Sequence, residues 1–249
     1  MRIVFLPLVL ALAGCGSRDA PAASTLAGSA DAFLQPAEGA GQPLTGLQTF
    51  VIVPEQSKAT YLANEEFFAG ALKKLGIAAG KRKVVGNTRA IEGQFQLDPE
   101  RPTARLGENR FTVRMNTFTT DQPSRDKYIR EDGPSFDAYP LATFRASAID
   151  GGSNTYRTGE DLSFKLTGDL TIRKIAKRVT FDVKAQLVGD TITGLATTRL
   201  LMSDFGIAPL DFYNTLTVAD AFGIEVRFTA RAQARSSTPT TRPGLGGRP

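Results

Sequence analysis

A dense cluster of charged residues lies in the segment SRDKYIREDGPSFDAYPLATFRA, residues 124 to 146, where eight of 23 side chains carry a charge. Paired carboxylates in such a cluster could do acid–base chemistry, provided that burial pushes their pKa values apart. Here each acid has an arginine or a lysine within a few positions, and such a neighbour favours the charged form of both groups. This balance of signs is typical of ion pairs and not of a reaction centre.

The composition excludes several classes of chemistry. The 249 residues contain no histidine, which removes Ser-His and Cys-His catalysis and the commonest zinc ligand. A single cysteine allows no internal disulfide and no thiolate zinc site. The net charge of +5 is dispersed between acidic residues without the basic and aromatic motifs of nucleic-acid binding. We therefore expect no enzyme activity, no cofactor, no metal and no nucleic-acid partner.

The elements that must position the charged cluster are strands. Apolar and polar residues alternate along most of the chain from residue 49 to 234, most regularly at Val179, Phe181, Val183, Ala185 and Leu187. Short connections between these segments favour antiparallel order, because parallel strands need long crossovers. About eight or nine strands must form either a sandwich or a closed barrel, and the pattern alone leaves both open. The segments that alternate are 50–53, 59–63, 90–97, 111–115, 142–149, 162–172, 179–187, 191–200 and 224–230.

Two segments have helical patterns. Residues 64–75 offer Asn64 as an N-cap, acids in the first turn and lysines in the last turn. Residues 124–130, at the start of the charged cluster, offer Ser124 as the cap of a two-turn helix. The sequence therefore predicts one or two short helices beside the strands.

The first 14 residues have the pattern of a secretory signal peptide, with Arg2 followed by a short apolar run. Residues 12–15, LAGC, resemble the lipobox of bacterial lipoproteins, in which cleavage leaves a lipidated cysteine as the first residue. An ordinary signal peptide with a chance cysteine is the alternative. We predict that Cys15 is lipidated and anchors the protein to a membrane, on the periplasmic side of a bacterial cell. Gly16, where an aspartate would suggest inner-membrane retention by resemblance to enteric lipoproteins, favours the outer membrane.

Changes in composition divide the rest of the chain. Residues 15–48 are rich in Ala, Gly, Ser and Pro, which predicts a flexible tether. Residues 49–234 form the predicted β domain. Residues 235–249 lack apolar positions for a core and are expected to be a disordered tail.

Several motifs in the β domain resemble the signature of the YceI-like proteins, also called polyisoprenoid-binding proteins. Together they cover residues 49 to 233. Lys174 stands where the family's TIRG motif has glycine, and Phe50 where the family usually has tryptophan, so the chain resembles a divergent member. The matching motifs are TTD at 119–121, RD at 125–126, IR at 129–130, FD at 136–137, YP at 139–140, Phe144, GQFQLD at 93–98, GDLTIRKIAKRVTFDV at 168–183 and SDFGI at 203–207.

The resemblance implies an all-β fold: a lipocalin-like, extended antiparallel β-barrel of about eight strands. In that family the apolar interior holds one long lipid, an isoprenoid chain or similar amphiphile, and an eight-stranded barrel is just wide enough for a small ligand. Simple core packing is the alternative role for each apolar residue. The candidate ligand-binding residues are Phe95, Leu97, Phe111, Val113, Met115, Phe144, Phe164, Leu166, Phe181, Val183, Ile224, Val226 and Phe228.

Arg125, Asp126 and Arg130 have two candidate roles besides catalysis. They could brace a helix and loop against the strands, which we favour, or contact a lipid head group, since arginine suits phosphate. The predicted function is a non-enzymatic envelope lipoprotein that binds, transports or stores a long-chain isoprenoid or fatty lipid. The alternative is a structural or interaction module with a packed barrel core. A homodimer is compatible with the sequence, which does not determine the oligomeric state.

Overall fold

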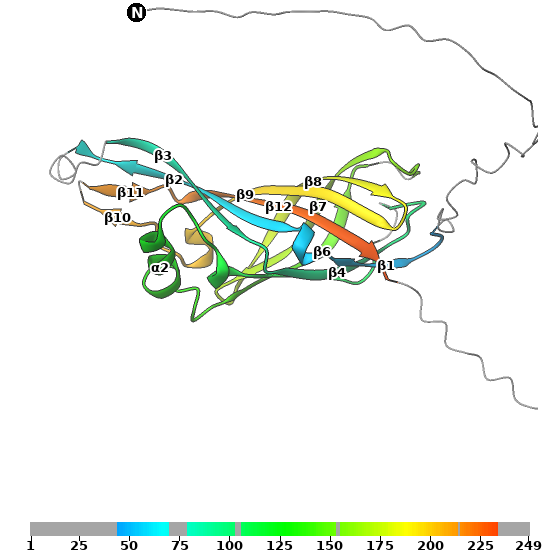
Figure 1. Ribbon diagram of the computed structural model, residues 1–249, viewed down its shortest axis with the longest axis horizontal. Helices are drawn as coiled ribbons and strands as arrows, with labels where there is room; N and C mark the ends of the chain where they lie inside the picture. The colour runs from blue at the N-terminus through cyan, green and yellow to red at the C-terminus, as the bar shows by residue number, and fades with distance from the viewer. Residues whose placement is uncertain (1–43, 70–78, 103–105, 153–154, 214, 234–249) are drawn as a thin grey trace, which may run out of the picture. The chain divides into compact units, whose positions relative to one another are not determined.

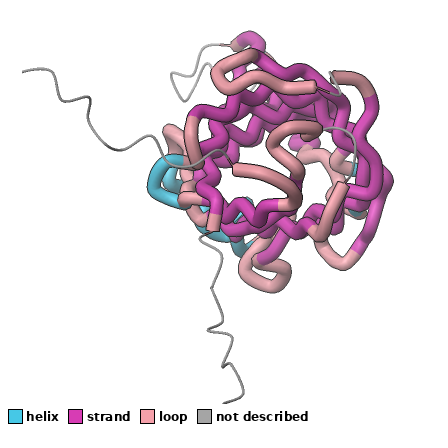
Figure 2. The backbone as a smooth tube through the Cα atoms, turned by 90° about the vertical axis from the view of Figure 1, so that its right-hand side faces the viewer, coloured by secondary structure: helices cyan, strands magenta, loops and turns pink. Residues whose placement is uncertain are grey.

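The alternating segments form an antiparallel sheet that closes into a barrel. Eight strands follow one another in the order β1-β4-β5-β6-β7-β8-β9-β12, and β12 pairs again with β1, so that Phe50 lies opposite Ala232. Figure 2 shows the strands as a ring seen along the barrel. This architecture confirms the predicted lipocalin-like barrel. The ring strands are β1 (Gln48–Ile52), β4 (Ile91–Leu97), β5 (Asn109–Arg114), β6 (Leu141–Asp150), β7 (Asp161–Ile172), β8 (Ile175–Val188), β9 (Thr191–Leu201) and β12 (Ala221–Ala232).

The computed structural model describes residues 44–69, 79–102, 106–152, 155–213 and 215–233. The predicted signal peptide, Cys15, most of the tether and the predicted C-terminal tail lie outside these residues, so their roles stay predictions. Within the described part of the chain, no helix has both the length and the apolar content needed to cross a bilayer.

Four further strands extend the sheet beyond the ring: β2 (Lys58–Phe67), β3 (Gly80–Thr88), β10 (Asp211–Phe212) and β11 (Leu216–Val218). β2 pairs with β3 on one side and with both β12 and β11 on the other. In Figure 1 these four strands reach past the ring, and helix α2 (Pro123–Glu131) lies below them. We call these four strands the extension. The sequence did not predict β3, β10 or β11.

β12 belongs to both the ring and the extension. Its C-terminal end pairs with β1, and its N-terminal part pairs with β2, from Gly223 opposite Leu62 to Arg227 opposite Lys58. The short 3-10 helix η1 (Pro54–Gln56) connects β1 to β2 along this edge. Buried Ser57 follows η1, and its hydroxyl accepts a hydrogen bond from the backbone N–H of Thr229 at 3.0 Å. One long strand therefore ties the extension to the barrel.

The predicted helix at 64–75 is wrong over its first four residues. Asn64–Phe67 continue β2 and pair residue by residue with β3, up to Phe67 opposite Gly80. Strand pairing on both sides of this segment outweighs its local helical pattern, because propensity is weak against tertiary context. Residues 70–75 lie outside the described residues.

The predicted helix at the charged cluster exists as α2, but Ser124 does not cap it. The helix begins at Pro123, with Gln122 as the N-cap residue and no side-chain cap hydrogen bond. Proline is well suited to the first helical position, since its fixed φ matches the helix and it has no N–H to satisfy there. Two further 3-10 helices are η3 (Met115–Thr117) and η4 (Ser203–Phe205). Met115, predicted as a strand residue, begins η3 and is buried.

The core of the barrel follows directly from the alternation. In β8, Val179, Phe181 and Val183 are buried while Thr180 and Asp182 between them are exposed. Successive side chains of a strand point to opposite faces of the sheet, so one face of each ring strand is directed inward. The barrel interior is therefore filled or lined by the apolar half of every strand.

Candidate ligand-binding cavity

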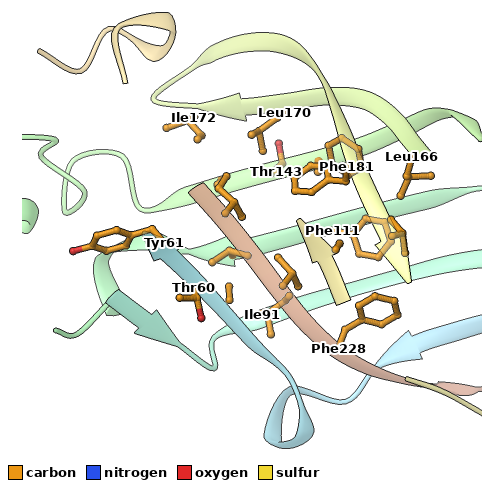
Figure 3. Close-up of a pocket in the computed structure, with 18 of the residues that line it drawn as sticks. Thr60, Tyr61, Ile91, Phe111, Thr143, Leu166, Leu170, Ile172, Phe181 and Phe228 are labelled. Carbon is orange, nitrogen blue, oxygen red and sulfur yellow. The ribbon is translucent and has the colours of Figure 1, made fainter. Parts of the chain in front are cut away.

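The interior of the barrel is hollow. A cavity of about 350 Å3 is lined by side chains from all eight ring strands, among them Ile52, Phe111, Phe144 and Ile224. All thirteen candidate ligand-binding residues line this cavity, and several appear in Figure 3 around its centre. Their contact with a ligand stays a prediction.

A row of five phenylalanine rings runs through the barrel interior, and four of them line the cavity; the fifth, Phe50, is fully buried and is not part of the lining. Phe50, Phe95, Phe111, Phe144 and Phe181 come from β1, β4, β5, β6 and β8, and consecutive ring centroids lie 5.6, 5.8, 6.4 and 5.0 Å apart. Such distances are those of favourable aromatic pairs. The four lining rings, from Phe95 to Phe181, give the cavity an aromatic surface without polar atoms, which suits a hydrocarbon chain.

Few polar side chains interrupt the apolar lining, and most have partners in the protein. The side chain of Asn109 donates to the carbonyl oxygens of Gly107 and Ala146 and accepts the N–H of Ala146. The Gln186 amide donates to the carbonyl oxygen of Gly159 at 2.6 Å. Among the described residues that line the cavity, Glu65 is the only acidic residue and Arg125 is the only basic one.

Arg125 on α2 and Glu65 on β2 form a two-point ion pair. The Nε and Nη2 atoms of Arg125 donate to the two carboxylate oxygens of Glu65, each at 2.9 Å. Nη1 also donates to Asp121 and, at 3.3 Å, to Thr120. Burial acts to lower the pKa of Arg125, but the hydrogen bonds and charges of Glu65 and Asp121 outweigh it and raise that pKa above its ordinary value. Arg125 is therefore charged and held by the protein itself.

Neither of the other two charged candidates takes part in this ion pair, although Asp126 shares the Thr120 hydroxyl with Arg125. Asp126 is buried and accepts hydrogen bonds from the backbone N–H and the hydroxyl of Thr120, at 2.9 and 2.7 Å. The backbone carbonyl of Arg130 accepts the N–H of Asp137 at 3.1 Å. Asp126 thus fixes the loop before α2 and the Arg130 backbone fixes the loop after it, whereas Arg125 fixes the helix to the extension. Among these three residues only Arg125 lines the cavity.

Tyr61 on β2 also lines the end of the cavity near α2, and its ring packs edge-on against Phe118 at 5.2 Å. Its hydroxyl is buried and has no hydrogen-bond partner within the described structure. In Figure 3 the hydroxyl points away from the other labelled residues. Burial, together with the negative charges of Asp126, Glu65 and Asp121, raises the pKa of Tyr61 well above its ordinary value and outweighs the lowering effect of the positive charge of Arg125. The phenol therefore stays neutral.

Sequence reasoning missed Glu65 and Tyr61. Both lie in β2, where residues Ala59, Tyr61, Ala63 and Glu65 share one face at a spacing of two and all line the cavity. That spacing was the available signal for Tyr61. The charge of Glu65 favoured a solvent-exposed helix instead, because acids are almost never buried without a partner.

The ring of strands and its apolar cavity define a lipocalin-like β-barrel of the kind that can hold a small ligand. Residues 50–230 match the YceI-like domain, and the chain belongs to this family. The predicted family membership is thus confirmed over most of the β domain.

Individual relatives agree with this assignment. Protein YceI from Escherichia coli is 30% identical over 106 residues, which are 42% of this chain and 50% of that protein. The chain thus spans about half the length of that curated relative. Two solved structures share the fold: BcnA from Burkholderia cenocepacia, and a polyisoprenoid binding domain from Saccharophagus degradans implicated in plant cell wall breakdown. The first has a TM-score of 0.53, is 21% identical and covers 72% of this chain and 98% of its own. The second has a TM-score of 0.52, is 10% identical and covers 75% of this chain and 99% of its own.

Proposed function

We propose that this chain binds a long-chain isoprenoid or a similar amphiphilic lipid inside the barrel, and that it does so without chemical conversion of the ligand. The observation that carries the proposal is the 350 Å3 cavity with its almost wholly apolar lining. Its volume falls in the range of small-molecule sites, about 300 to 1,000 Å3. The polyisoprenoid binding named for the Saccharophagus degradans domain supports the choice of ligand class.

Apolar contact alone supplies enough free energy for such binding. Each methylene group that leaves water contributes about 0.8 kcal/mol. At roughly 30 Å3 for a group of the size of water, the cavity of about 350 Å3 has room for about twelve such groups, so the end of a longer chain extends beyond it. A packed barrel core, the alternative function, leaves no space of this size, so the cavity favours binding over a purely structural role.

The proposed cellular role is that of an envelope lipoprotein, anchored through Cys15 on the periplasmic side, that stores or carries the lipid. The sequence pattern around Cys15 supports this part of the proposal. We expect wild-type protein in the membrane fraction and a Cys15→Ser variant to lose stable attachment, since anchoring by acyl chains needs two or more of them. Equal membrane retention of both proteins would argue against lipidation.

Ligand binding is tested by extraction. The full chain with Cys15→Ser is purified without detergent, extracted with organic solvent and analysed by mass spectrometry, and uptake of a fluorescent fatty acid or prenol is titrated. An Ala196→Trp variant places a large ring inside the cavity and should reduce uptake, whereas Val188→Trp, at an exposed site outside the lining, should not. Repeated absence of an extracted lipid together with no uptake would contradict the proposal.

A further inference from the structure

The charges at the cavity wall are arranged so that they cancel within the protein. Glu65 and Arg125 are the charged pair of the described lining, and their side chains are 8% and 12% exposed. Their two hydrogen bonds of 2.9 Å align the planar guanidinium with both carboxylate oxygens. This fork geometry is the strongest form of an arginine–carboxylate pair.

Arg125 has little capacity left for a ligand. Its Nε, Nη1 and Nη2 atoms all donate within the protein, to Glu65, Asp121 and Thr120. Two carboxylates thus surround a single guanidinium, so this end of the cavity carries no net positive charge. A phosphate or carboxylate head group would have to displace Glu65, and Glu65 would then be buried without its partner.

That displacement is costly. A buried charge without a partner is strongly unfavourable, and breaking a buried pair is far worse than never forming it. The free energy needed to remove an uncharged hydroxyl, carbonyl or ester group from water is much smaller, and such a group needs only a single hydrogen-bond partner. The neutral phenol of Tyr61 and the paired amides of Asn109 and Gln186 add no charge to the rest of the lining.

We propose that the cavity selects lipids whose buried polar group is uncharged, and that Glu65 determines this selectivity by occupying Arg125. The inference rests on the proposed lipid-binding function and deepens it. It also decides between the two roles considered for Arg125, since a guanidinium held by Glu65 braces α2 and is not free to bind an anionic head group.

The test compares two ligands of the same chain length at pH 8, hexadecanol with an uncharged head group and hexadecanoate with an anionic one. The full chain with Cys15→Ser is titrated with each ligand by displacement of a fluorescent apolar probe. We expect the protein without a change in its cavity to bind hexadecanol at least about tenfold more tightly than hexadecanoate. A difference of this size is what one charge-assisted contact can produce. In Glu65→Gln, Arg125 is released and the affinity for hexadecanoate should rise about tenfold, while the affinity for hexadecanol changes little.

Two further variants complete the experiment. Glu66→Gln changes the neighbouring residue, which is partly exposed, lies outside the cavity lining and has its Oε2 atom 4.0 Å from Nζ of Lys81; it should leave both affinities unchanged. Asp121→Asn weakens a contact of Arg125 at an exposed position and should raise hexadecanoate affinity less than Glu65→Gln, while preserving the fold. The inference would be overturned if the unmodified cavity bound hexadecanoate as tightly as hexadecanol. It would also be overturned if neither Glu65→Gln nor Asp121→Asn raised the affinity for hexadecanoate, and either result would leave lipid binding intact. Binding of neither ligand would instead overturn the proposed function.

Discussion

Glu65 of β2 and Arg125 of α2 are 60 residues apart in the chain, yet they meet in a two-point ion pair with both contacts at 2.9 Å. The pair joins the helix of the charged cluster to the extension, at one end of the cavity. Arg125 of the charged cluster thus holds α2 against the extension, as expected for the bracing role.

Breaking this pair from one side should destabilise the protein more than removing it completely. Arg125→Leu leaves the buried Glu65 carboxylate without a partner, and we expect it to lower the free energy of unfolding by about 3 kcal/mol. Glu65→Leu leaves Arg125 paired with the exposed Asp121, so its loss should be smaller. The double variant should lie within about 1 kcal/mol of wild type, because neither charge remains. Urea denaturation of all four proteins gives the double-mutant cycle. Additive losses would show that the two side chains are not coupled.

The buried hydroxyl of Tyr61 should be dispensable. It has no partner within the described structure, so Tyr61→Phe removes an unsatisfied group and should raise the free energy of unfolding by about 1 kcal/mol. Tyr156→Phe is the matched control, because the Tyr156 hydroxyl donates to the carbonyl of Glu160 and accepts the N–H of Leu187, both at 2.7 Å. We expect Tyr156→Phe to lower the free energy of unfolding, measured by thermal or urea denaturation, by about 1 to 2 kcal/mol. A loss of stability in Tyr61→Phe similar to the control would mean that the Tyr61 hydroxyl is satisfied in solution.

Gly168 of β7 should not tolerate a side chain. A Cβ atom there would lie 2.1 Å from the backbone oxygen of Arg145 and 2.6 Å from the Cα of Ala146, next to the register shift in β6. Backbone atoms cannot move aside as a flexible side chain can. We therefore expect Gly168→Ala to lower the free energy of unfolding by about 3 kcal/mol. At Gly223 of β12 the nearest atoms are 3.5 Å away, and Gly223→Ala should change stability by less than about 1 kcal/mol. Equal melting temperatures for the two variants would contradict the close approach of β6 and β7.

Asp220 should contribute stability that disappears in acid. Hydrogen bonds from the Ser203 hydroxyl and backbone N–H hold the pKa of Asp220 below its ordinary value of 3.8. A group whose pKa falls on folding stabilises the protein above its unfolded pKa and loses that contribution as pH falls through the folded pKa. Asp220→Asn should therefore be less stable than wild type at pH 7, and the difference should shrink below pH 3.8.

The pH dependence is measured by urea unfolding at several pH values. Asp211→Asn, at an exposed position in β10, is the control and should follow the wild-type curve. A difference between Asp220→Asn and wild type that stays constant from pH 7 into acid would show that the charge of Asp220 is not its source.

The ring strands were predictable from the sequence because each has one buried and one exposed face. Phe181 and Val183 of β8 are directed inward and Asp182 outward, which is the pattern that local reading detects. β3 was not predictable in this way, since Lys81, Arg82 and Lys83 follow one another and are all exposed. Only its second half, with Val84, Gly86 and Thr88 buried, has an inward face, and its first half is held by pairing with β2.

The site was predictable in part for the same reason. Alternation identified the inward-facing residues, such as Phe111 and Phe144, but the same pattern is expected for a packed core and for a hollow one. Arg125 was recognised as a candidate, whereas its partner Glu65 was not, because a single sequence does not show that β2 lies beside α2. Long-range neighbours of this kind become visible only once the strands are ordered in space.

The sharing of β12 between the ring and the extension also has a kinetic consequence. The barrel closes where Phe50 meets Ala232, so the first and last strands of the ring must find each other across nearly the whole domain. Contacts between residues so far apart in sequence slow folding, because the entropy of the intervening loop is lost before they form. A chain that ends at residue 220 lacks β12, so we expect its ring strands to form at most an open sheet with β1 and β9 at unpaired edges, and without an enclosed cavity.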